Sequence, residues 1–303
     1  MGTIRIVADS TCDLSAELKD KFNIITIPLC IVMEDQTYFD GESITPDQIY
    51  LWSDANKLTP KTAAVPYDRA AEVLEPLMKN GDEIIFFGIS EQMSTTCNII
   101  RLIASDYNYD KLHIIDSMSL STGIGIQILY AAQLVMEGKS ASEIIELVEN
   151  RRSKVRASFV VETLTYLARG GRCKPVTALL GNTLKLKPQI VVERGSMGVS
   201  RKYRGKQSSV ILKYVKDLED ALLHADPTCV FITHSGCEDE LLEEVRRYLE
   251  SLDRFENIYT TRAGGVISSH CGPGTLGVLF SFFTRFAVAI AGAVTITVTV
   301  FTV

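Results

Sequence analysis

The sequence lacks the short signatures that mark most nucleotide, metal and hydrolase sites. It has no GxxxxGK[ST] loop, and no GxGxxG follows a predicted strand, so nucleotide binding has no support. It has no HExxH pair and no metal-spaced histidine cluster, and the chain holds only four histidines. The stretch GISEQ fails the GxSxG pattern, because Gln92 stands where the second glycine is needed. We therefore expect neither a metal nor a cofactor.

The sequence also gives no indication of disulfides, a secretory signal or a basic block. The seven cysteines are scattered and form no CxxC pair, which argues against a zinc ribbon or a disulfide framework and for a reducing compartment. The opening MGTIRIVADST has charge and a strand pattern in place of a signal peptide. The net charge is −6 and no long basic run occurs, so nucleic acid is not an expected partner. The sequence predicts a cytoplasmic protein.

The first half of the chain alternates buried strands with helices. Short apolar runs at 4–10, 83–90 and 112–117 precede helical patterns near 15–22, 94–104 and 121–137. Continuous apolar strands that alternate with helices predict a parallel sheet covered on both faces.

In the second half of the chain the order of predicted strands, turns and helices is different, and it predicts a mixed sheet with helices. A strand, a short helix and a Gly-Gly turn are expected over 156–174. A strand–turn–strand unit at 186–206 would use Gly195 and Gly198 as turn residues. Further on we expect a helix over 207–224, a strand over 229–236, an amphipathic helix over 239–252, and one or two more strands up to His270.

A chain of 303 residues favours two domains. The predicted fold class is α/β, with a parallel three-layer sheet domain (1–155) and a smaller mixed-sheet α/β domain (156–285). Residues 286–303 contain no charge and reach the lower length limit for a membrane span, yet Thr alternates with apolar residues there, which is a strand period. Three interpretations of this apolar tail remain open: a half-buried strand, a cloning or reading-frame artefact, or a membrane anchor.

Small polar residues end each predicted strand of the first half: Asp9 and Ser10, Ser90, and Asp116 with Ser117. In open α/β sheets, ligands bind outside the carboxyl ends of the strands. Helix capping is the alternative role for these side chains.

Three segments form the candidate site. Residues 58–67 are predicted to be a loop in which two prolines flank Thr62. Ser94, Thr95 and Thr96 fall at a predicted helix start, where free N–H groups favour an anion. Glycines and a proline surround His270, and an apolar run follows. Hydroxyls, one titratable histidine and an adjacent apolar region predict a receptor for an anion with an apolar body.

Seven short stretches resemble one known family: ADSTCDLS, PKT before a proline, ISEQMSTT, IDSMSLSTG, LARGGR, LKLKP and SHCGPGTLG, in this order over residues 3–280. The chain resembles the DegV family of bacterial fatty-acid-binding proteins. The resemblance implies a long-chain fatty acid buried between two domains and no cofactor. It also implies a role as the non-catalytic acyl-carrier subunit of a fatty-acid kinase, which presents the carboxylate to a separate ATP-binding protein. Any membrane contact would be transient.

The resemblance also implies which residues bind. The ligand-binding set would be Thr62, Ser94, Arg172 and His270, and Arg204 would contact the kinase or the head group. The chain departs from the family pattern at Ala63, Glu91 and Thr95. Because the charge of Glu91 would repel a carboxylate, we expect its side chain to point outward.

Two other functions remain open on the residues alone. Ser94 could act as the nucleophile of a serine hydrolase acting on an acyl ester, with His270 as the base and Asp116 as the orienting carboxylate. The apolar tail could instead attach an interaction protein to a membrane.

Overall fold

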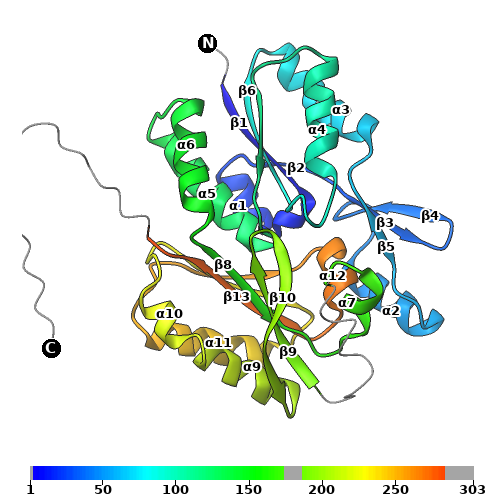
Figure 1. The fold of residues 1–303 in the computed structure, drawn as a ribbon, viewed down its shortest axis with the longest axis vertical. Coiled ribbons are helices and arrows are strands. Elements are labelled where there is room, and N and C mark those ends of the chain that lie inside the picture. Colours follow the sequence, from blue (N-terminus) through cyan, green and yellow to red (C-terminus); the bar gives the residue numbers. More distant parts are fainter. Residues whose placement is uncertain (1–2, 174–185, 284–303) are drawn as a thin grey trace, which may run out of the picture.

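The computed structural model describes residues 3–173 and 186–283, and all structural statements below concern these residues. They form a parallel sheet, a separate mixed sheet and a small antiparallel sheet, surrounded by helices (Figure 1). The predicted fold class, α/β with one parallel sheet and one mixed sheet, is confirmed. None of the helices in these ranges is long and apolar enough to cross a bilayer.

The parallel sheet has the strand order β2-β1-β6-β7. Its strands are β1 (Ile4–Asp9), β2 (Ile25–Ile27), β6 (Glu83–Gly88) and β7 (Leu112–Asp116). Successive side chains of a strand point to opposite faces. In β6, Ile85 and Phe87 therefore enter one core, whereas Ile84 and Phe86 enter another. One core lies under α1 (Ala16–Lys21), α5 (Thr122–Met136) and α6 (Ala141–Arg152), and the other under α3 (Tyr67–Lys79) and α4 (Thr96–Asp106).

The order of these strands reverses next to β1. β2 pairs with one edge of β1 and β6 with the other. The crevice at such a reversal, outside the carboxyl ends of the strands, is where open α/β sheets bind ligands. A short 3-10 turn at Ser10–Cys12 follows β1, and residues 89–95 lead from β6 to α4.

A three-stranded antiparallel sheet, which the sequence did not indicate, lies beside this crevice. It consists of β3 (Cys30–Met33), β4 (Gln36–Phe39) and β5 (Lys61–Ala63), and α2 (Pro46–Asn56) connects β4 to β5. The prediction of a loop around Thr62 is wrong, because Thr62 lies in β5 and pairs with Ile31. A three-residue strand is too short to show a period in the sequence.

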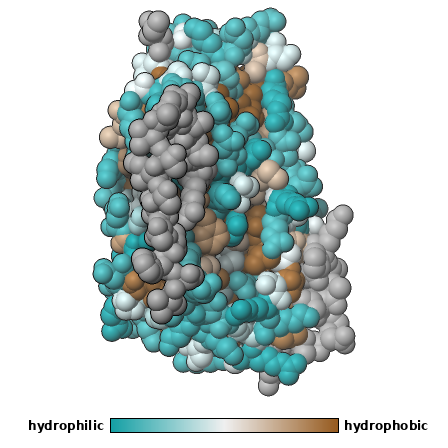
Figure 2. Space-filling view, turned by 60° about the vertical axis from the view of Figure 1, so that its left-hand side comes forward, coloured by the Kyte–Doolittle hydropathy of each residue, from teal (hydrophilic) through white to brown (hydrophobic). Residues whose placement is uncertain are grey.

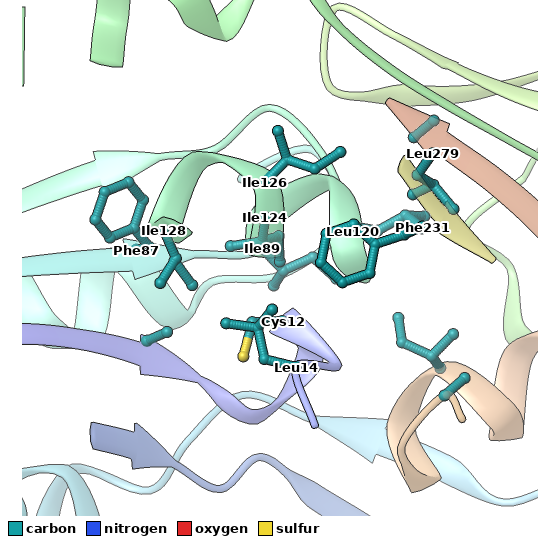
Figure 3. Packing of buried hydrophobic residues seen from close by; sticks show 14 of the residues in the cluster. Cys12, Leu14, Phe87, Ile89, Leu120, Ile124, Ile126, Ile128, Phe231 and Leu279 are labelled. Carbon is teal, nitrogen blue, oxygen red and sulfur yellow. The ribbon is translucent and has the colours of Figure 1, made fainter. Parts of the chain in front are cut away.

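The mixed sheet has the order β10-β9-β8-β13-β11-β12. Its strands are β8 (Val155–Val160), β9 (Leu186–Glu193), β10 (Ser196–Arg204), β11 (Val230–Ser235), β12 (Ile258–Arg262) and β13 (Thr275–Ser281). One face packs against α9 (Gln207–Lys216), α10 (Glu219–Leu223) and α11 (Asp239–Ser251). The other face contributes Phe159, Phe231 and Leu279 to the core that also holds α5, and Figure 3 follows this core from Phe87 and Ile128 to Phe231 and Leu279.

Three details of the second half differ from the sequence predictions. Gly198 lies inside β10, opposite Val191, and only Gly195 occupies the turn, with φ 79°. The helix expected over 207–224 is split into α9 and α10. After β12, the chain forms a helix, α12 (Gly265–Cys271), where another strand was expected.

The predicted domain boundary lies where β8, the first strand of the mixed sheet, begins at Val155. The apolar tail lies outside the described residues. Figure 2 shows a face on which most side chains are hydrophilic and hydrophobic residues gather in a band near the middle.

Candidate functional site

A cavity lies at the crevice between the parallel sheet, β5 and α12. Its empty volume is about 520 Å³ with the solvent at its mouth included. The side chains around it come from segments far apart in sequence, and they include the four predicted ligand-binding residues: Thr62, Ser94, Arg172 and His270. Apolar side chains such as Leu29, Ile89, Met93 and Ile267 supply most of the remaining wall.

Thr62 and His270 meet at this cavity. The Oγ1 of Thr62 lies 2.7 Å from Nε2 of His270, a hydrogen-bond distance. β5 positions Thr62, and the last turn of α12 positions His270. The other ring nitrogen of His270, Nδ1, is buried and has no hydrogen-bond partner in the described part of the chain.

His270 and its neighbour Cys271 both lie on α12, and both line the cavity. The N-cap Gly264 and the first helical residue Gly265 donate their N–H groups to buried carboxylates: Gly264 to Asp13 at 2.8 Å and Gly265 to Asp40 at 2.6 Å. These acceptors satisfy the free amides at the helix start, which short-range sequence patterns do not reveal.

Burial has opposite effects on the acid–base groups around α12. It lowers the pKa of His270 to about 4, and the charge of Arg172 contributes to that shift. His270 is therefore neutral at pH 7. Burial raises the pKa of Asp13 to about 8 despite hydrogen bonds from Ser121 and Gly264. The pKa of Asp40 is also raised by burial.

Ser94 stands just before α4, as the sequence predicted. Thr95 is the N-cap of α4, and the Oγ of Ser94 lies 2.9 Å from the Oγ1 of Thr96 and accepts from the Thr96 N–H at 3.3 Å. The Ser94 hydroxyl lines the cavity, and the positive end of the α4 dipole begins just after this residue. This is a setting that stabilises a carboxylate without a buried ion pair.

Glu91 does not place its charge at the cavity. Its carboxylate forms an ion pair with Arg101, and Glu91 is not among the residues that line the cavity. Its backbone N–H donates to Asp116. The concern that Glu91 would repel a bound carboxylate is thereby removed.

The two candidate arginines differ in position. Arg172 lines the cavity at its exposed edge and donates from Nη1 to the carbonyl of Gly170 at 2.8 Å. Arg204 is the last residue of β10, is exposed and does not line this cavity. A role for Arg204 in binding a partner stays a prediction.

The hydrolase arrangement is not assembled in the described residues. His270 directs Nε2 to Thr62, and Ser94 pairs with Thr96. Asp116 accepts from the backbone N–H of Met118 at 2.8 Å and of Glu91 at 3.3 Å. A nucleophile needs its base within hydrogen-bond reach and a third group to orient the base, and these three residues serve other partners.

Asp9 links the segments that follow β1 and β6. Its Oδ1 accepts from the Thr11 N–H at 3.0 Å, and its Oδ2 from the Ile89 N–H at 2.7 Å. These bonds join the ends of β1 and β6 behind the cavity.

A second cavity, of about 330 Å³ with the solvent at its mouth included, adjoins the first. Leu120, Ile267 and Cys271 line both cavities. The second one extends to Phe159 and Leu279 on the mixed sheet, so an apolar path leads from His270 into the core. Leu120 and Ile267 are not among the predicted site residues. The signal for them is that both are apolar and stand next to a strand-end or glycine-rich segment.

No group of metal-ligating side chains occurs within residues 3–173 and 186–283. The polar groups that line the first cavity are thus the hydroxyls of Thr62 and Ser94, the neutral imidazole of His270 and, at the exposed edge, the guanidinium of Arg172.

Comparisons with known proteins agree on one family. A model described as an uncharacterised protein of the DegV family matches residues 3–282. A DegV domain-containing protein from Clostridium perfringens is 32% identical over 286 residues, which cover 92% of this chain and 98% of the relative. The structure of a fatty-acid-binding DegV family protein from Thermus thermophilus matches with a TM-score of 0.82 and 27% identity, over 93% of this chain and 100% of that one. A stearic-acid-binding protein from Eubacterium ventriosum matches with a TM-score of 0.80 and 26% identity, over 92% and 98% of the two chains.

Proposed function

The chain belongs to the DegV family, and we propose that it binds a long-chain fatty acid, with the carboxylate at Thr62, Ser94 and His270 and the hydrocarbon in the second cavity. The observation that carries the proposal is the junction of the two cavities at Leu120, Ile267 and Cys271. It places hydroxyl and imidazole groups at one end of a path whose other end is apolar.

Burial of the hydrocarbon supplies most of the affinity in this proposal. Each buried CH₂ contributes about 0.8 kcal/mol, so a chain of about fifteen carbons gains on the order of 10 kcal/mol before ordering costs. The head-group contacts then fix which end of the ligand faces outward.

In this proposal each of the two predicted domains supplies a different part of the binding site. Residues 1–155 supply the hydroxyls and the α4 start, and residues 156–285 supply His270 and much of the tail wall. The two domains together enclose one ligand.

We further infer that the protein does not transform the fatty acid alone. It presents the carboxylate to a separate ATP-binding kinase subunit. A carboxylate oxygen attacks the γ-phosphorus of ATP, the bond from that phosphorus to the ADP oxygen breaks, and acyl-phosphate and ADP result. Neutral donors hold the carboxylate more loosely than a buried ion pair would, which leaves it free to react. Arg172 at the cavity mouth and Arg204 on β10 are the positive groups assigned to head-group or partner contact.

The test is lipid analysis of the purified protein. The full chain is expressed in bacteria and denatured, and the organic extract is quantified by mass spectrometry. We expect close to one fatty acid per chain. A protein that carries no fatty acid, and that fails to take up stearic acid added in solution, would contradict the proposal.

A further inference from the structure

The last residue of α7 (Thr165–Gly170) packs directly against the imidazole of His270. A Cβ atom built on Gly170 would lie 2.1 Å from Nδ1 and 2.9 Å from Cε1 of His270. Real Cβ atoms do not approach other heavy atoms this closely, so only a residue without a side chain fits beside this ring. The imidazole is held between Thr62 on one nitrogen and the α7 backbone on the other.

The requirement for glycine at residue 170 is one of space and not of backbone conformation. Gly171, the next residue, has φ 67°, a left-handed conformation. Gly170 is the last helical residue of α7, and its φ is not positive. Alanine is favoured over glycine inside helices by about 1 kcal/mol, so the backbone alone would accept it at residue 170. The two adjacent glycines are needed for different reasons.

A hydrogen bond holds the α7 backbone at Gly170 in place beside His270. Arg172 donates to the carbonyl of Gly170 at 2.8 Å, which closes the turn after α7. The α7 backbone at Gly170 covers Nδ1 of His270, which is buried and has no hydrogen-bond partner among the described residues. Because buried N–H groups without acceptors are rarer than carbonyl-type acceptors without donors, this favours the proton on Nε2, where it points to Thr62.

We propose that Gly170 is a positioning residue for the fatty-acid head group: its missing side chain lets the α7 backbone hold the His270 imidazole against Thr62. This inference rests on the proposed function for its link to the ligand. A side chain at residue 170 would turn the ring away from Thr62 and break the contact between them.

Gly170→Ala tests this inference, with Gly171→Ala as the matched control. A Cβ on Gly171 meets no atom within 4 Å, so Gly171→Ala strains the backbone without touching His270. We expect Gly170→Ala to weaken stearate binding about tenfold, the effect of roughly one hydrogen bond. In the same variant, NMR should show the pKa of His270 moving up from about 4 toward 6.5 as the ring leaves its buried place. Gly171→Ala should lower the melting temperature but leave both properties unchanged.

A double-mutant cycle with His270→Ala distinguishes an effect of Gly170 on the position of the His270 imidazole from a general disturbance of the fold. If Gly170 acts through the imidazole, Gly170→Ala should have no further effect on binding once His270 is alanine. If Gly170→Ala alone does not fold, restoration of folding by His270→Ala would support the same clash. An unchanged His270 pKa in Gly170→Ala, or an equal loss of binding in both backgrounds, would overturn the inference. A wild-type chain that binds no fatty acid would instead refute the proposed function, and the NMR comparison would still test the contact.

Discussion

Thr62 and His270 are 208 positions apart in the sequence, and their Oγ1 and Nε2 atoms lie 2.7 Å apart at the mouth of an apolar path. One residue comes from the short strand β5 and the other from the last turn of α12. The contact links the two halves of the chain directly at the proposed head-group site.

Replacing Thr62 with valine removes the hydroxyl and keeps the shape of the side chain. A hydrogen bond to a charged group contributes about 1.5–3 kcal/mol, and we expect a loss of binding free energy in that range for stearate. Isothermal titration of delipidated protein measures the change. Thr62→Ser keeps the hydroxyl and should stay close to wild type, and a Thr62→Ser variant as weak as Thr62→Val would show that the methyl group matters instead.

Replacing His270 with alanine should separate retention of the ligand from its reaction. Tail burial dominates affinity, so most of the fatty acid should remain in the purified variant. Acyl-phosphate formation with an ATP-binding kinase partner should fall further, because the carboxylate loses its orientation. Mass spectrometry and the transfer assay on the same preparation give both quantities, and equal losses in the two would contradict this division of roles.

Filling the junction of the cavities should change which fatty acids are held. Ile267 lines both cavities, and a phenylalanine there would narrow the path. We expect the extracted lipids to shift to shorter chains or to disappear, with a stability cost of about 1–3 kcal/mol from overpacking. Ile211 is the matched control, since it is fully buried among α9–α11 and lines neither cavity. Ile211→Phe should cost similar stability and leave the lipid profile unchanged.

Replacing Asp13 with asparagine should alter how stability depends on pH. The pKa of Asp13 is about 8 in the folded protein and ordinarily 3.8, so the folded state keeps a proton that the unfolded chain has lost. Between these values, stability falls as pH rises, by up to about 1.4 kcal/mol per pH unit. Asparagine does not titrate, so Asp13→Asn should gain on wild type as the pH rises.

Urea unfolding between about pH 6.5 and 8 is the suitable measurement for Asp13→Asn. His270 acts in the opposite sense: its folded pKa of about 4 lies below 6.5, so its contribution to stability is lost as pH falls through that interval. Above pH 6.5 most unfolded chains have lost the His270 proton, and because both proteins keep His270, its remaining contribution cancels when they are compared. Parallel pH profiles for the two proteins would show that Asp13 is already ionised in the folded chain.

Patterns of local origin were readable in the sequence. The parallel strands, α4 beginning near Ser94, and the amphipathic α11 follow from apolar period and capping residues, which depend on neighbours a few positions away. The stretches that resemble the DegV family placed Thr62, Ser94, Arg172 and His270 in one candidate set, and the structure places all four around one cavity.

Only the tertiary structure decided what surrounds that set. The start of α12 is capped by Asp13 and Asp40, more than two hundred positions upstream, which accept the N–H groups of Gly264 and Gly265. The space that Gly170 leaves for His270, and the ion pair that turns Glu91 to Arg101, also depend on segments brought together by folding. The sequence determined which local elements and chemical groups are available, whereas long-range packing decided which of those groups share a cavity and in which charge state, because burial and partner geometry exist only in the folded chain.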